Sequence, residues 1–169
     1  MKIEYYLRTY KPSVLNLGCG KSCPAEHYGI DITDAAGVDR VCDLTGGIPI
    51  DSDTFDVVYA RDFLEHIPQG QPCVDIMEEI YRVLKPGGKL QTLVPSTSGN
   101  SMGAFQDPYH VSFWNKVKFY YFLDDKFGNG FRGLYNIQCW FEPIVLTTFD
   151  NEYDVTYVEA VLKKKELPE

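Results

Sequence analysis

The chain has 169 residues, with 24 acidic against 16 basic side chains and a net charge of −8. Nucleic-acid binding depends largely on basic side chains that neutralise phosphates, so this balance argues against a nucleic-acid partner. A hydrophobic content of 44% fits one folded domain, and no run approaches the roughly 20 apolar residues of a membrane span, so no membrane partner is expected.

Apolar runs alternate with amphipathic stretches, which is typical of a parallel sheet covered by helices. The expected strands are, in chain order, 13–17, 28–32, 40–42, 55–60, 89–94, 137–147 and 154–163. Residues 150–154 are expected to turn the last two strands into an antiparallel pair. Only about ten residues separate the first two strands, barely enough for a parallel crossover, so we expect its helix to be shortened or absent.

Two helices are expected between these strands. The apolar residues of the first recur at three- and four-residue steps and therefore share one face: Val74, Met77, Ile80, Tyr81 and Leu84. Pro86-Gly87-Gly88 is expected to stop this helix and Lys89 to open the next strand. The second helix is expected at about 113–127, with most of its aromatic rings in the core.

Residues 15–22, "LNLGCGKS", end like a phosphate-binding P-loop. That motif needs a glycine where Leu15 stands, in the middle of an apolar strand, so a nucleoside triphosphate site is disfavoured. A dinucleotide fingerprint would need a glycine or alanine where Cys23 stands, and Pro24 follows instead of a helix. What is left is a strand that ends in Gly-x-Gly.

The five cysteines, an odd number, indicate free thiols and a cytoplasmic location. Cys19, Cys23 and His27 have a spacing that is compatible with zinc, but no fourth ligand is near, and structural zinc sites nearly always have four. These cysteines are interpreted as small buried or loop residues, and no metal is expected.

Five segments occur in an order that resembles the class I S-adenosylmethionine-dependent methyltransferases: "VLNLGCG", "GIDI", "VCDL", "IPIDSDTFDVVYARDFLEHI" and "RVLKPGGKL". They cover about residues 13–95. The resemblance implies an α/β fold with a Rossmann-like, doubly wound, mostly parallel sheet of seven strands and an antiparallel C-terminal strand. The single domain would comprise an N-terminal segment (1–12), a cofactor-binding half (13–95) and an acceptor loop, helix and hairpin (96–169).

The resemblance also implies where S-adenosyl-L-methionine binds and where the product S-adenosyl-L-homocysteine is left. The implied cofactor residues follow four strands: Leu17, Gly18, Cys19 and Gly20 near methionine, Asp31 and Ile32 at the ribose, Asp43 and Leu44 at the adenine, and Arg61 and Asp62 at the methionine end. The glycines allow the backbone to approach the ligand closely. Two alternatives are open: Asp31 as an ordinary strand-end acid, and Asp43 as part of a plain turn.

On the acceptor side, the long polar loop after the fifth main strand contains "DPYH", which resembles an element of some small methyltransferases. His110 is a candidate general base, with Asp107 beside it, or else it merely caps the next helix. Phe63 is expected to face the transferred methyl. Tyr109 and Trp114 are candidate walls of an acceptor pocket, or else core residues.

The predicted function is methyl transfer to an oxygen, nitrogen or carboxylate of a small-molecule acceptor, by a monomer or homodimer. Residues 60–63, Ala-Arg-Asp-Phe, replace the Asn/Asp-Pro-Pro-Tyr/Phe element of amino-methylating nucleic-acid enzymes. The alternative is a non-catalytic binding or scaffold protein that retains the fold, and a NAD- or nucleotide-dependent enzyme is a more distant third.

Overall fold

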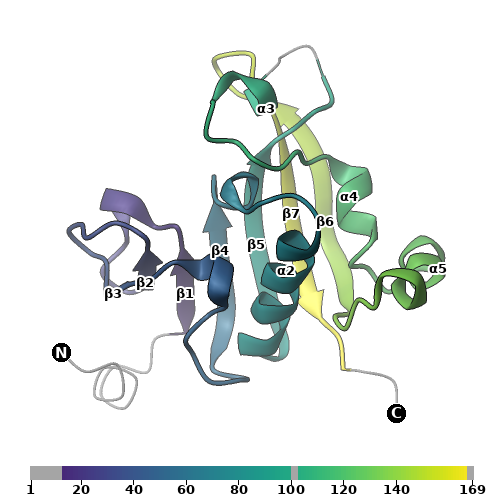
Figure 1. Ribbon diagram of the computed structural model, residues 1–169, viewed down its shortest axis with the longest axis horizontal. Helices are drawn as coiled ribbons and strands as arrows, with labels where there is room; N and C mark the ends of the chain where they lie inside the picture. Colours follow the sequence, from purple (N-terminus) through teal and green to yellow (C-terminus); the bar gives the residue numbers. More distant parts are fainter. Residues whose placement is uncertain (1–12, 100–102, 167–169) are drawn as a thin grey trace.

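The computed structural model describes residues 13–99 and 103–166, so the predicted N-terminal segment 1–12 lies outside the described residues. One sheet contains seven strands in the order β3-β2-β1-β4-β5-β7-β6 (Figure 1). The strands are β1 (Val14–Leu17), β2 (Tyr28–Asp31), β3 (Arg40–Val41), β4 (Phe55–Arg61), β5 (Leu84–Pro95), β6 (Phe141–Asp150) and β7 (Thr156–Lys164). Their pairings are parallel except for the two made by β7. The predicted mostly parallel α/β sheet with an antiparallel C-terminal strand is confirmed.

The helices are short apart from two. The α-helices are α2 (Gln71–Val83), α3 (Gly103–Gln106), α4 (Lys116–Tyr120) and α5 (Lys126–Tyr135), and the 3-10 turns are η1 (Gly20–Ser22), η2 (Leu44–Gly46) and η3 (Leu64–His66). Between β1 and β2 the only helical element is η1, so the expected loss of the first crossover helix is confirmed. None of the helices in the described ranges is long and apolar enough to cross a lipid bilayer.

Helix α2 lies in front of the central strands (Figure 1) and buries the face that its periodicity predicts, including Met77 and Ile80. It ends at Val83, and β5 begins at once at Leu84 rather than at Lys89. The expectation that Pro86-Gly87-Gly88 separates helix from strand is therefore wrong. These residues lie within β5, where the pairing with β4 shifts register. Gly87 has a φ of +75°, so the irregularity is built into the strand instead of preceding it.

The single helix expected at 113–127 is also wrong, because two capping side chains start separate helices. Asn115 accepts a hydrogen bond from Lys118 N at the start of α4, and Asp125 accepts one from Gly128 N at the start of α5. Helix α5 continues to Tyr135 and ends at Asn136, whose φ is +52°. Strand β6 consequently begins at Phe141 and not at residue 137.

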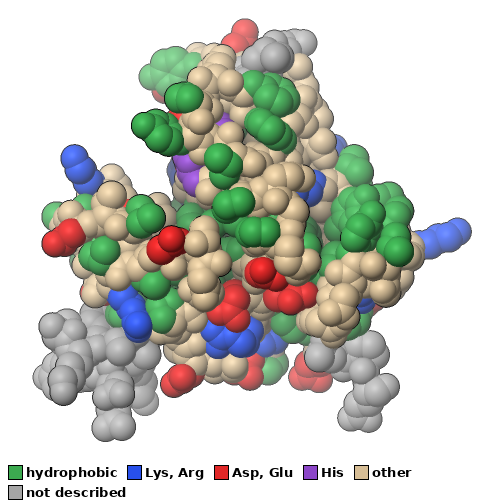
Figure 2. Space-filling model, viewed as in Figure 1, with side chains coloured by type: hydrophobic (Ala, Val, Ile, Leu, Met, Phe, Trp, Pro, Cys, Tyr) green, Lys and Arg blue, Asp and Glu red, His purple; other side chains and the backbone are tan. Residues whose placement is uncertain are grey.

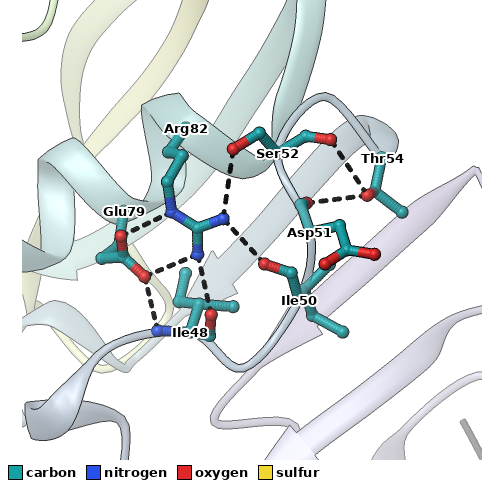
Figure 3. Close-up of polar contacts among 7 residues, drawn as sticks. All are labelled: Ile48, Ile50, Asp51, Ser52, Thr54, Glu79 and Arg82. Atoms are coloured by element: carbon teal, nitrogen blue, oxygen red, sulfur yellow. Dashed lines mark hydrogen bonds and ion pairs between the residues drawn. The ribbon is translucent and has the colours of Figure 1, made fainter.

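Arg82 ties α2 to the chain that leads into β4 (Figure 3). Its guanidinium donates to Ile50 O (2.7 Å) and Ile48 O (2.8 Å) and pairs with both carboxylate oxygens of Glu79. Glu79 Oε2 in turn accepts from Ile48 N at 2.8 Å. A bidentate, charge-assisted arrangement of this kind is stronger than neutral hydrogen bonds. It fixes the segment between η2 and β4 against the helix.

This ion pair makes stability depend on pH. The hydrogen bonds from Arg82 lower the pKa of Glu79 below its usual value of 4.5. The contribution of the pair is therefore fully present above pH 4.5 and is lost as pH falls through the folded-state pKa. We expect wild type to be more stable than Glu79→Gln at neutral pH and this difference to shrink below pH 4.5.

Urea unfolding at a series of pH values measures the difference. Asp75→Asn is the matched control, because Asp75 is an exposed acid on the same helix that contacts Gln71. A difference between wild type and Glu79→Gln that stays constant with pH would contradict the assignment.

Candidate functional site

The carboxyl ends of β1 to β4 meet where the strand order reverses, between β1 and β4. This switch point is the usual ligand crevice of open α/β sheets. A pocket of about 320 Å³ lies there. Seven predicted site residues line it: Gly18, Asp31, Ile32, Asp43, Leu44, Asp62 and Phe63. Four others that line it were not predicted as ligand contacts: Cys42, Thr45, His66 and Ile67.

Gly18 closes the pocket from the β1 side, and its conformation excludes other residues. Its φ is +63°, and a Cβ built there would lie 2.7 Å from Cδ2 of Phe63. Gly18 N also donates to Ile30 O at 2.9 Å, which holds the turn against β2. Leu17 is fully buried behind this turn and supports it from the core.

Gly20 and Asp31 are joined by a hydrogen bond of 2.8 Å from Gly20 N to Asp31 Oδ2. The other oxygen, Oδ1, accepts from the N–H and hydroxyl of Thr33 at 2.8 and 2.6 Å. Burial by itself raises the pKa of Asp31, but the hydrogen bonds from Thr33 and Gly20 outweigh it and leave the pKa lowered. Asp31 is thus a charged acceptor at the pocket wall, and two carboxylate oxygens have capacity for further donors.

Cys19 and Cys23 pack on β2 at Gly29, a residue that the sequence did not single out. A Cβ at Gly29 would lie 2.7 Å from Cys19 Sγ and 2.6 Å from Cys23 Sγ. The loop that replaces the first crossover helix can sit this close to the sheet because Gly29 has no side chain. Cys19 and Gly20 lie in this loop and do not line the pocket. All five cysteines are free thiols.

Asp43 caps η2 beside the pocket. Its Oδ1 accepts from the N–H and hydroxyl of Thr45 at 2.9 and 2.7 Å, and these bonds lower the pKa of Asp43. The arrangement is that of a capped turn, which accounts for one carboxylate oxygen. Oδ2 has no hydrogen-bond partner among the residues that the structure describes. Leu44 follows it with its side chain buried at the pocket.

At the end of β4 the chain turns sharply through Asp62, whose φ is +48°. Asp62 and Phe63 face the pocket, whereas Arg61 borders a different hollow, with Tyr59 and Leu93, on the sheet. The Arg61 side chain therefore does not line the first pocket, although its Nε lies 3.7 Å from Asp62 Oδ2. Burial raises the pKa of Asp62, although the neighbouring Arg61 acts in the opposite direction.

A second pocket, of about 290 Å³, adjoins the first, and both are lined by Asp62 and His66. The predicted pair Asp107 and His110 lines this second pocket. His110 Nδ1 lies 3.1 Å from Ala104 O, and its Nε2 lies 4.0 Å from Asp107 Oδ2. The His66 and His110 rings are 5.1 Å apart, centroid to centroid. The space-filling view shows histidine side chains at a hollow below the α3 segment (Figure 2).

Glu65, which the sequence did not single out as a site residue, also lines the second pocket. It is 2% exposed, and burial raises the pKa of its carboxyl to about 8. No residue in the described ranges donates a hydrogen bond to either carboxylate oxygen. The only sequence signal for it was a charged residue between the apolar Leu64 and Ile67, which does not reveal burial.

Trp114 is a core residue and not a pocket wall, so the interpretation of it as an acceptor contact is wrong. It is fully buried, and its Nε1–H donates to Ser112 Oγ and Leu64 O at 2.9 and 3.2 Å. Tyr109 is 77% exposed and borders neither pocket. Its main-chain O nevertheless lies 3.2 Å from His66 Nδ1.

Comparison with known proteins agrees with this geometry. Residues 15–92 match the methyltransferase domain family. The chain matches no curated protein sequence. A 16S rRNA (adenine(1408)-N(1))-methyltransferase variant from Catenulisporales acidiphilia is 10% identical, with coverage of 100% of this chain and 94% of that chain and a TM-score of 0.64.

Two further structures are similar at 14% identity and a TM-score of 0.58. One is a SAM-dependent methyltransferase from Methanosarcina mazei, with coverage of 90% of this chain and 92% of that chain. The other is phosphoethanolamine N-methyltransferase 2 from Haemonchus contortus in complex with S-adenosyl-L-methionine, with coverage of 90% of this chain and 48% of that chain. Residues 15–92 therefore match the methyltransferase domain family, and the chain as a whole has the fold of the class I S-adenosylmethionine-dependent methyltransferases.

Proposed function

We propose that the chain binds S-adenosyl-L-methionine in the 320 Å³ pocket and transfers its methyl group to a small molecule in the 290 Å³ pocket. The observation that carries this proposal is the shared wall of Asp62 and His66. A methyl donor and its acceptor must meet at one point, and the two pockets meet there.

The polar groups of the first pocket match the donors of the cofactor. We assign the ionised Asp31 as the acceptor of hydrogen bonds from the two ribose hydroxyls. The unpaired Oδ2 of Asp43 is assigned as the acceptor for the adenine amine. Leu44 is assigned a packing contact with the adenine ring. Phe63, which packs on Gly18, is assigned to the region of the transferred methyl. The loop 17–20 and the main chain at 61–62 are assigned the methionine part.

Methyl transfer needs positioning more than activation, because the sulfonium is already reactive. A lone pair of the acceptor attacks the methyl carbon, the sulfur–carbon bond breaks, and S-adenosyl-L-homocysteine is left as a neutral thioether. An acceptor hydroxyl or amine also gives up a proton. His110, oriented by Ala104 O and near Asp107, is the proposed base that takes it at Nε2.

The net charge of −8 and the small second pocket favour a metabolite-sized acceptor over a nucleic acid. The fold does not choose between these, since the similar structures include both an rRNA methyltransferase and a phosphoethanolamine methyltransferase. A cytoplasmic monomer or homodimer is our working proposal for the protein itself.

Calorimetric titration with S-adenosyl-L-homocysteine, with ATP and NADH as controls, tests the function. We expect micromolar binding of S-adenosyl-L-homocysteine alone, weakened by roughly 1–3 kcal/mol in Asp31→Ala through the lost hydrogen bonds. Asp34→Ala is the matched control, because Asp34 is exposed in the same loop and does not line the pocket. No binding would favour the scaffold alternative, and preferred binding of ATP or NADH would favour a nucleotide-dependent enzyme.

Gly18 and Gly20 offer a matched pair of substitutions. Both have positive φ, but a Cβ at Gly20 would meet nothing within 4 Å, whereas one at Gly18 would strike Phe63. We expect Gly20→Ala to cost roughly 1–2 kcal/mol of stability from backbone strain alone. Gly18→Ala should cost more stability, measured by urea unfolding, and should also weaken the binding of S-adenosyl-L-homocysteine, measured by calorimetry. Equal effects of the two changes would show that the Gly18–Phe63 contact does not shape the pocket.

His110→Gln tests the acceptor side. We expect unchanged affinity for S-adenosyl-L-homocysteine and turnover reduced by roughly 10²–10⁴-fold, since a general base contributes that much. The assay is formation of S-adenosyl-L-homocysteine in the presence of a panel of small alcohols, amines and carboxylates. Turnover equal to wild type would leave His110 with a structural role.

A further inference from the structure

Three side chains at the second pocket form a cluster of metal-ligand type. Glu65 and His66 come from η3, and His110 comes from the loop before α4. Each offers one ligand atom, and these atoms lie within 4.8 Å of one another. No other group of three histidine, cysteine or acidic residues in the described ranges meets this criterion. Two of the three histidines of the chain are therefore gathered at one acid.

Glu65 is the independent sign that the cluster is built for a ligand. It is 2% exposed, and both carboxylate oxygens lack a hydrogen-bond donor among the residues that the structure describes. A buried polar group without a partner costs free energy, and a buried charge costs more. A cation between Glu65 and the histidines would satisfy the carboxylate.

Both histidines are oriented as ligands. Nδ1 of His66 faces Tyr109 O at 3.2 Å, and Nδ1 of His110 faces Ala104 O at 3.1 Å. A carbonyl oxygen only accepts, so each Nδ1 is the donor, and in a neutral imidazole Nε2 then has the lone pair that a metal ion needs. Metal-binding histidines typically donate their second ring nitrogen to a carbonyl or carboxylate in this way.

The dimensions and the ligand types select the kind of ion. Bonds of about 2.1 Å place ligand atoms on one ion roughly 3–4 Å apart, and the three ligand atoms, which lie within 4.8 Å of one another, are near that spacing. Two imidazoles and one carboxylate suit Zn²⁺, Co²⁺ or Fe²⁺, whereas Mg²⁺ prefers oxygen ligands. His66 is exposed at the pocket, which gives an ion a way in and leaves coordination positions open.

We propose that Glu65, His66 and His110 bind a divalent transition-metal ion beside the cofactor pocket. The consequence for the reaction rests on the proposed function: a bound ion holds an acceptor through a hydroxyl or carboxylate oxygen and acidifies a hydroxyl. In the metal-bound protein Nε2 of His110 is a ligand, so the role of base that the proposed function gives to this ring applies to the metal-free protein. The inferred acceptor class is an oxygen nucleophile.

The experiment titrates the chelator-treated, full-length chain with Co²⁺, followed by visible absorption and calorimetry, with Zn²⁺ and Mg²⁺ as competitors. The variants are Glu65→Gln and His110→Gln, with His27→Gln as the control. His27 is the remaining histidine, and its ring centroid lies 6.1 Å from that of Tyr59. Circular dichroism and thermal unfolding establish that each variant folds. Loss of a group that only orients a ligand costs roughly 10–100-fold in affinity, so loss of a ligand should cost more than about 100-fold.

The proposal is supported if one Co²⁺ binds per chain with absorption bands of nitrogen and oxygen coordination, and if Zn²⁺ but not Mg²⁺ displaces it. Co²⁺ binding should also be lost in folded Glu65→Gln or His110→Gln and kept in His27→Gln. The proposal is overturned by absence of Co²⁺ binding, by binding that persists in both ligand variants, or by a thiolate charge-transfer band, which would point to Cys19 and Cys23. S-adenosyl-L-homocysteine is titrated into the same samples. Its binding without Co²⁺ binding refutes only the metal site, and the reverse result refutes only the proposed function.

Discussion

The main-chain carbonyls of η3 hold the walls of the second pocket in place. Leu64 O accepts from Ser112 Oγ and Trp114 Nε1, and Glu65 O accepts from the N–H groups of Val111 and Ser112. These bonds join the end of β4 to a segment nearly fifty residues later. Because they are buried around Trp114, they cannot be exchanged for bonds to water without a large cost. The position of His110 beside Glu65 and His66 follows from this connection.

The first pocket, of about 320 Å³, depends on close approach of the backbone. Without the first crossover helix, the loop after β1 must lie directly on the sheet, and Gly29 gives room for Cys19 and Cys23. Gly18 in turn allows Phe63 to come close, which brings the loops after β1 and β4 together. The charge on Asp31 is kept by hydrogen bonds from Gly20 in the loop after β1 and from Thr33 in the loop after β2. The pocket is thus shaped by the absence of side chains at two positions and by one carboxylate at a third.

The prediction from sequence succeeded where structure follows a local pattern. It failed where helix caps and strand irregularities set the ends of helices and strands. The face of α2 could be found from periodicity, and the strand-end acids and the glycine turn from the resemblance of their motifs to those of the methyltransferases. The helix at 113–127 could not, because Asn115 and Asp125 each start a new helix and Gly128 packs against the carbonyls of the preceding turn. Pro86-Gly87-Gly88 has the composition of a turn, yet it lies within β5, because β4 pairs with this strand both before it, at Leu84, and after it, from Lys89 onward.

By itself the sequence determined the order of strands along the chain, and its resemblance to the methyltransferases pointed to most of the residues that line the 320 Å³ pocket, which lie at strand ends along one edge of the sheet. It named His110 and Asp107 but gave no reason to join them to Glu65. Only the tertiary structure decided that Glu65 is buried without a hydrogen-bond donor, that two histidines turn their Nδ1 atoms to carbonyls, and that Trp114 is core. The physical reason is that burial and hydrogen bonding between residues forty or more positions apart, as for His66 and Tyr109, depend on the packed fold and leave no periodic trace in the chain.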